Sequence, residues 1–109
     1  MTNRNRMQKL QQALSIFADE RNWKQYHTPK NLAAALSVEC SELLEIFQWM
    51  TADQSYSPDP ATKLHILEEI GDIMIYLSMI AAKFDIDPIE AASAKLDKNR
   101  TRYPVPTPE

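Results

Sequence analysis

Three pairs of a capping residue followed by proline divide this chain into segments. They are Thr28-Pro29, Asp59-Pro60 and Asp87-Pro88. Threonine and aspartate oxygens accept hydrogen bonds from the first free amides of a helix, and proline fits the first helical position because it has no amide to satisfy. Each pair therefore predicts the start of a helix. We expect these helices over residues 29–50, 60–84 and 88–101.

A further helix is predicted ahead of them, over residues 6–21. Its apolar residues recur at helical spacing: Met7, Leu10, Leu14, Phe17 and Ala18. The chain holds one glycine in 109 residues, and this favours helices because strand-and-turn folds use many glycines. Residues 51–59 form a polar loop. We expect one all-α domain of four helices over residues 1–109, with a core of about 6–104 and a tail of 105–109.

The helix predicted over residues 60–84 is apolar nearly all round. One stripe contains Leu64, Leu67, Ile70, Met74, Leu77, Ala81 and Phe84. Such a helix is either central in its fold or lies at a subunit interface. We therefore expect a helical bundle that completes its core by homo-oligomerisation. Gly71 inside this helix costs about 1 kcal/mol relative to alanine, and serves either a close approach beside Asp72 or simple packing.

Composition excludes several classes of partner. The net charge of −3 does not suggest a surface for a nucleic-acid polymer, which would normally show a basic patch. The longest apolar run, residues 73–82, is shorter than the roughly 20 residues that span a bilayer, so we expect no membrane association. The lone Cys40 cannot form an internal disulfide, and the N-terminal residues lack a signal-peptide core, so we expect a cytoplasmic protein.

Two carboxylate pairs carry the chemistry. Glu39 and Glu42 are three residues apart, as are Glu69 and Asp72, and residues three apart share one face of a helix. Carboxylates gathered in partly apolar surroundings resist ionisation unless a cation neutralises them. An all-oxygen set suits Mg²⁺, or Mn²⁺ as a substitute, usually bridging to phosphate. Phosphate chemistry is therefore indicated.

Other interpretations of these carboxylates are weaker. A solvated acidic face is the usual fate of single glutamates, but Asp72 heads the most apolar stretch of the chain. Glu45 is either a further ligand or a supporting group. A di-iron bundle needs Glu-x-x-His pairs, whereas the residues three before His27 and His65 are lysine and threonine.

Aromatic and basic side chains supply candidates for nucleotide binding. Trp23, Trp49 and Tyr76, with His27 nearby, either stack on a nucleobase or cap the core. At the end of the last helix stand four more polar candidates: Lys95, Asn99, Arg100 and Arg102. They either contact the nucleotide or form an ordinary charged helix terminus.

Several stretches together resemble the MazG-like nucleotide pyrophosphohydrolases of the all-α NTP pyrophosphatase superfamily. They are residues 20–23, 27–32, 39–49, 68–77 and 95–104. The paired ExxE and ExxD define the superfamily. The Phe47-Gln48-Trp49 and Asn99-Arg100-x-Arg102-Tyr103-Pro104 matches are specific to the branch that contains mammalian dCTP pyrophosphatase and small bacterial MazG-like proteins.

The resemblance implies a role for each candidate. Mg²⁺ would be held by Glu39, Glu42, Glu69 and Asp72. The base and sugar pocket would be formed or bordered by Trp23, His27, Trp49 and Tyr76. Lys95 and Asn99 would contact the nucleotide, and Arg100 or Arg102 the phosphates. Family members are dimers or tetramers, often with sites built across subunits, and we favour a tetramer.

The expected activity is hydrolysis of a nucleoside triphosphate to its monophosphate and pyrophosphate. Glu42 is our first choice for the group that activates water, and Glu45 the second. dCTP or a modified pyrimidine deoxynucleotide is the expected substrate, removed from the nucleotide pool as house-cleaning. The alternatives are a broad-specificity or dUTP pyrophosphatase, and a non-catalytic helical oligomer that binds nucleotides.

Overall fold

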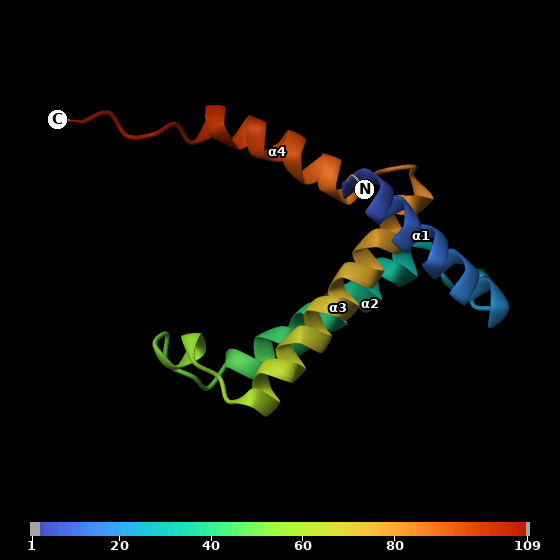
Figure 1. Ribbon diagram of the computed structural model, residues 1–109, viewed down its shortest axis with the longest axis horizontal. Coiled ribbons are helices and arrows are strands. Elements are labelled where there is room, and N and C mark those ends of the chain that lie inside the picture. The colour runs from blue at the N-terminus through green and yellow to red at the C-terminus, as the bar shows by residue number, and fades with distance from the viewer. Residues whose placement is uncertain (1–2, 109) are drawn as a thin grey trace.

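The computed structural model describes residues 3–108, and all regular secondary structure within that range is helical (Figure 1). The α-helices are α1 (Asn3–Glu20), α2 (Pro29–Phe47), α3 (Pro60–Lys83) and α4 (Pro88–Arg102), with short 3₁₀ turns η1 (Lys24–Tyr26) and η2 (Gln54–Tyr56). The predicted all-α class is confirmed. The predicted domain limits at residues 1 and 109 lie outside the described range.

The three capping residues start their helices as predicted. The Thr28 side chain accepts a hydrogen bond from the Asn31 amide at 3.1 Å, and Asp59 accepts one from the Thr62 amide at 2.7 Å. Asp87 accepts from the Ile89 amide at 2.8 Å. Helices α2, α3 and α4 therefore begin at the prolines that follow.

The predicted ends of α1, α3 and α4 fall within one residue of those observed, whereas α1 begins at Asn3 and not at the predicted residue 6. The prediction ran α2 to residue 50, but the helix ends at Phe47. Beyond α1 and α3, Asn22 and Asp85 adopt left-handed backbone conformations with φ of 57° and 55°. The Trp23 amide then bonds to the Ala18 carbonyl and the Ile86 amide to the Ala81 carbonyl, both at 2.9 Å. Glycine usually marks such ends, and asparagine and aspartate replace it here.

Helices α2 and α3 pack side by side and make the largest contact between elements (Figure 1). Helix α1 packs on α3, where the Gln11 side chain donates to the backbone carbonyls of Ser78 at 3.1 Å and Ile86 at 3.2 Å. Helix α4 contacts α1 and α3 but otherwise extends away from the α2–α3 pair. The predicted four-helix bundle is therefore not closed within one chain.

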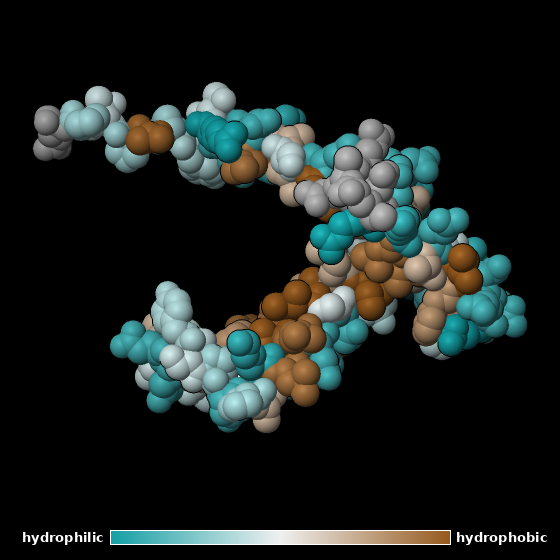
Figure 2. Space-filling model, viewed as in Figure 1, coloured by the Kyte–Doolittle hydropathy of each residue, from teal (hydrophilic) through white to brown (hydrophobic). Residues whose placement is uncertain are grey.

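The open arrangement leaves much apolar surface uncovered. The radius of gyration is 17.3 Å, against about 13 Å for a compact domain of this length. The accessible area is 8763 Å², against about 6,200 Å² expected for this mass. Apolar side chains cover α3 in Figure 2, and the exposed ones include Leu64, Leu67, Ile70, Met74 and Leu77. Single-chain packing thus does not cover the α3 stripe.

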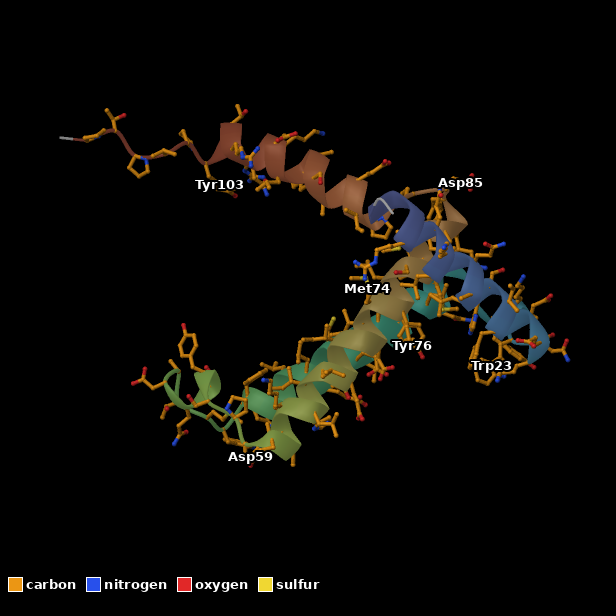
Figure 3. The ribbon with its side chains drawn as sticks, in the orientation of Figure 1. Trp23, Asp59, Met74, Tyr76, Asp85 and Tyr103 are labelled. Carbon is orange, nitrogen blue, oxygen red and sulfur yellow. The ribbon has the colours of Figure 1, made fainter. Side chains whose placement is uncertain are left out.

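Gly71 lies beside this exposed stripe. A Cβ added to it would meet nothing within 4 Å, so no neighbour in the described part of the chain requires a glycine there. Figure 3 shows Met74 on the side of α3 that faces the bend toward α4, and Tyr76 on a different side. The two sides of α3 therefore have separate surroundings.

None of the helices described between residues 3 and 108 has the length and apolar character needed to cross a bilayer.

Candidate active site

Carboxylates from α2 and α3 meet where the two helices pack. Glu39, Glu69 and Asp72 each offer an oxygen that lies within 4.8 Å of the other two. Glu69 is buried, with 6% of its surface exposed, and Glu39 is half-buried. Three acidic groups at this separation repel one another when they are all ionised.

This crowding changes the protonation of Glu39. The side chain of Glu69 shares a hydrogen bond with it and raises the pKa of Glu39 above its ordinary value of 4.5, and desolvation raises that pKa further. The negative charge of Asp72 acts in the same direction. The metal-free site therefore holds a proton more tightly than an isolated glutamate does.

Glu42, the fourth predicted ligand, lies outside this group of three and stands one helical turn beyond Glu39 along α2. The side chain of Glu39, through a shared hydrogen bond and its charge, raises the pKa of Glu42 above 4.5. Glu42 and Glu45 also line an open cavity of about 610 Å³ with Thr62 and His65. Both candidates for activating water therefore face solvent-accessible space beside the cluster.

The donor set fits a hard divalent cation. All its ligands are carboxylate oxygens, which Mg²⁺ and Mn²⁺ prefer. Oε2 of Glu39 and Oε2 of Glu69 are buried and have no hydrogen-bond partner. A buried carboxylate oxygen without a donor is costly, and a cation at this point would satisfy both atoms.

A largely apolar cavity of about 420 Å³ adjoins the cluster. Asp72 lies in its wall, and the rest of the lining comes from α1, α3 and the segment between α1 and α2: Ala13, Leu14, Phe17, Trp23, His27, Ile75, Tyr76 and Met79. Aromatic walls suit a flat ring system, which they contact face on or edge on. A ligand could thus place a ring in this cavity and a charged group at the carboxylates.

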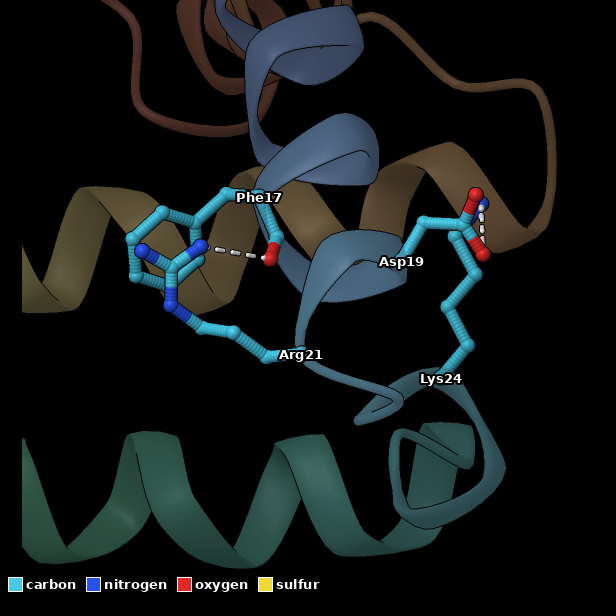
Figure 4. Close-up of polar contacts among 4 residues, drawn as sticks. All are labelled: Phe17, Asp19, Arg21 and Lys24. Carbon is cyan, nitrogen blue, oxygen red and sulfur yellow. Dashed lines mark hydrogen bonds and ion pairs between the residues drawn. The ribbon is translucent and has the colours of Figure 1, made fainter.

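Contacts at the end of α1 hold Trp23 in this cavity. The Trp23 ring meets the Phe17 ring edge to face, with centroids 5.7 Å apart. Figure 4 shows Arg21 lying over the Phe17 ring, 3.6 Å from its centroid, and donating to the Phe17 carbonyl at 3.0 Å. Lys24 and Asp19 approach to 3.9 Å on the other side of the turn. The chain therefore fixes its own aromatic wall.

His27 forms a polar point in the same wall. Burial lowers the pKa of His27 below its ordinary value of 6.5, and the charge of Lys83 lowers it further. Nδ1 of His27 is buried without a hydrogen-bond partner. At neutral pH the ring is therefore an uncharged group with an unused nitrogen.

Comparison with known proteins identifies the family of this chain. Residues 34–109 match the model of the MazG-like family, which is more than half of the chain. The chain belongs to the MazG-like family. It is 42% identical to a pyrophosphatase from Archaeoglobus fulgidus whose crystal structure it matches with a TM-score of 0.86, over 96% of this chain and 98% of that one.

Curated relatives of this MazG-like chain include two mammalian enzymes. It is 45% identical to dCTP pyrophosphatase 1 of Bos taurus over 93 residues, covering 82% of this chain and 54% of the relative. It is 45% identical to dCTP pyrophosphatase 1 of Homo sapiens, covering 81% and 53% respectively. The chain thus spans about half the length of the curated relatives it matches.

Within one MazG-like chain, several predicted site residues lie away from the cluster. Trp49 follows α2, is 89% exposed and does not line the aromatic cavity. Lys95, Asn99, Arg100 and Arg102 stand on α4, which extends away from the α2–α3 pair. Arg100 is paired with Asp97 at 2.9 Å. A single chain therefore does not bring these residues to the carboxylates.

The structure also adds residues that sequence reasoning missed. Phe17 was assigned to the core stripe of α1, yet it lines the aromatic cavity of this MazG-like chain. The sequence predicts no site role for His65, whereas its Nε2 lies 3.5 Å from Oε1 of Glu69, four residues later. The i,i+4 spacing of a histidine and a glutamate was the available signal.

Proposed function

We propose that this chain hydrolyses a nucleoside triphosphate to the monophosphate and pyrophosphate. The observation that carries the proposal is the carboxylate cluster, whose buried Oε2 atoms on Glu39 and Glu69 lack partners, adjoining the aromatic cavity through Asp72. A nucleotide carries phosphates at one end and a flat base at the other. A cation site at the carboxylates would suit the phosphates, and the adjoining aromatic cavity would suit the base. The names of the relatives, dCTP pyrophosphatase and pyrophosphatase, support the same reaction class.

In this proposal Glu39, Glu42, Glu69 and Asp72 hold Mg²⁺, with Mn²⁺ as a substitute. Bound metal would neutralise the charge that develops on the phosphates. Glu42 faces the open cavity and orients or deprotonates the attacking water. Glu45 is the second candidate for this step.

The proposed substrate is dCTP or a modified pyrimidine deoxynucleotide. Trp23 and Tyr76 would contact the base, with the uncharged His27 beside them. A broad-specificity or dUTP pyrophosphatase is the alternative, because aromatic stacking tolerates every base. House-cleaning of the cytoplasmic nucleotide pool is the proposed role.

We further propose that the site is completed by homo-oligomerisation, with a tetramer favoured over a dimer. The apolar stripe on α3 is exposed in a single chain, and a second copy would bury it. In such an assembly Trp49 and the polar residues of α4 would serve a neighbouring chain's site: Lys95, Asn99, Arg100 and Arg102. Arg100 or Arg102 would then contact the phosphates, and Lys95 and Asn99 the nucleotide.

The test is pyrophosphate release from a panel of canonical and modified dNTPs and NTPs, with Mg²⁺ and with EDTA. We expect release that requires the metal and is fastest with a pyrimidine deoxynucleotide. Equal rates with all bases would favour the broad-specificity enzyme. No release from any nucleotide, by protein shown to be folded, would leave a non-catalytic nucleotide-binding oligomer.

A further inference from the structure

His65 and Glu69 stand one turn apart on α3. Nε2 of His65 lies 3.5 Å from Oε1 of Glu69. The His65 side chain is 55% exposed, whereas that of Glu69 is only 8% exposed. The imidazole therefore reaches from the surface toward a carboxylate that solvent scarcely touches.

The two oxygens of Glu69 have different surroundings. Oε1 faces His65, and Oε2 is buried without a partner. A carboxylate held at one oxygen rotates less freely about its last bonds, so its second oxygen keeps a defined direction. Glu69 is also the most buried member of the acidic cluster that contains Glu39 and Asp72.

We propose that His65 is a positioning residue that holds Glu69 ready to bind the divalent cation. Groups that hold a metal ligand by hydrogen bonding fix its orientation, and their loss typically weakens metal affinity 10- to 100-fold. The contact needs only an Nε2–H, which is present in the imidazolium and in one neutral tautomer. This role rests on the metal site of the proposed function.

The location of His65 is consistent with this role. It lines the open cavity of about 610 Å³ together with Glu42 and Thr62. Helix spacing alone would also pair a histidine with a glutamate four residues on, as a surface contact that affects only stability. Such a contact would leave the affinity for metal unchanged, and this difference separates the two roles.

The experiment compares His65→Leu, which removes the donor, with His65→Gln, whose amide nitrogen can replace Nε2. Lys63→Gln is the matched control, because it removes a charge from the same exposed turn without touching Glu69. Binding of Mn²⁺ is measured without nucleotide by the electron paramagnetic resonance signal of the free ion. Thermal melting in EDTA checks that each variant is folded.

We expect His65→Leu to weaken Mn²⁺ binding about 10- to 100-fold. His65→Gln should retain most of the affinity, and the control should match wild type. Unchanged affinity in His65→Leu would overturn the proposal. Equal loss in both His65 variants would also overturn it, because the imidazole would then be a ligand itself. If wild type bound no Mn²⁺, the metal site of the proposed function would fail first.

Discussion

Glu39 on α2 and Glu69 on α3 are far apart in the sequence, yet each offers an oxygen within 4.8 Å of the other. The two carboxylates are brought together because α2 and α3 pack closely against each other. Glu69 thereby raises the pKa of Glu39, and both residues retain a buried oxygen without a partner. The pair is the centre of the proposed metal site.

Replacing a cluster carboxylate by its amide should abolish turnover without unfolding the chain. Asp72→Asn and Glu69→Gln keep the size of each side chain but remove the charge that binds the cation. We expect no detectable metal-dependent pyrophosphate release, and melting in EDTA at least as high as wild type, because like-charge repulsion is relieved. Glu68→Gln, on the adjacent position of α3, is the control and should remain active. Normal turnover by Asp72→Asn would exclude it from the metal site.

Stability should depend on pH and metal together. The pKa values of Glu39 and Glu42 lie above 4.5 in the folded chain, so the fold holds protons that the unfolded chain has already released. Without metal, the free energy of unfolding should therefore fall as pH rises from 4.5 through the raised pKa values of these two glutamates. Mn²⁺ replaces those protons, so its stabilising effect should grow over the same range. Melting curves with and without Mn²⁺ measure both trends, and a metal effect independent of pH would contradict the prediction.

Trp23 should contribute to substrate binding rather than to the chemical step. Loss of one stacked aromatic ring from a base typically weakens binding on the order of 10- to 100-fold. We expect Trp23→Ala to raise KM by this order and to change kcat much less. Tyr26→Ala is the control, because Tyr26 is 62% exposed and does not line the aromatic cavity. A selective fall in kcat would place Trp23 in a different role.

The exposed side of α3 should be an interface between copies. Met74 is 42% exposed on this side, and lysine there would introduce a charge that association must bury. We expect wild type to be oligomeric by light scattering and Met74→Lys to dissociate, whereas Glu68→Lys should not.

Gly71→Ala should stabilise an isolated chain by up to about 1 kcal/mol, since its Cβ meets no neighbour. Weaker association in Gly71→Ala would indicate a close approach by the second copy, and a monomeric wild type would exclude the interface.

A buried hydroxyl on α3 offers a test of packing alone. Ser78 is 0% exposed, and its Oγ has no hydrogen-bond partner. Removing an unsatisfied buried polar group should stabilise the fold, so we expect Ser78→Ala to raise the free energy of unfolding by about 1 kcal/mol. Ser41→Ala removes an exposed hydroxyl bonded to the Ser37 carbonyl and is the control. A clear loss of stability in Ser78→Ala, measured by urea unfolding, would mean that the hydroxyl has a partner.

Local sequence signals predicted the fold class and the starts of α2, α3 and α4. Thr28, Asp59 and Asp87 cap their helices because a short side chain and the following proline meet all the local requirements. After α1 and α3, Asn22 and Asp85 adopt the left-handed conformation for which glycine is the usual signal, so no glycine marked these two turns in the sequence. The family was also predicted from sequence and is confirmed by the match over residues 34–109.

The sequence by itself determined which carboxylates share a helix face, because residues three apart on one helix have fixed positions. Only the tertiary structure decided that Glu39 meets Glu69, that Phe17 turns from the predicted core to the aromatic cavity, and that His65 reaches Glu69. It also decided that α4 extends away from the carboxylates instead of closing a bundle. Helix periodicity is a local property of the sequence. Contacts between helices depend instead on which apolar faces pack against each other, either within one chain or between chains.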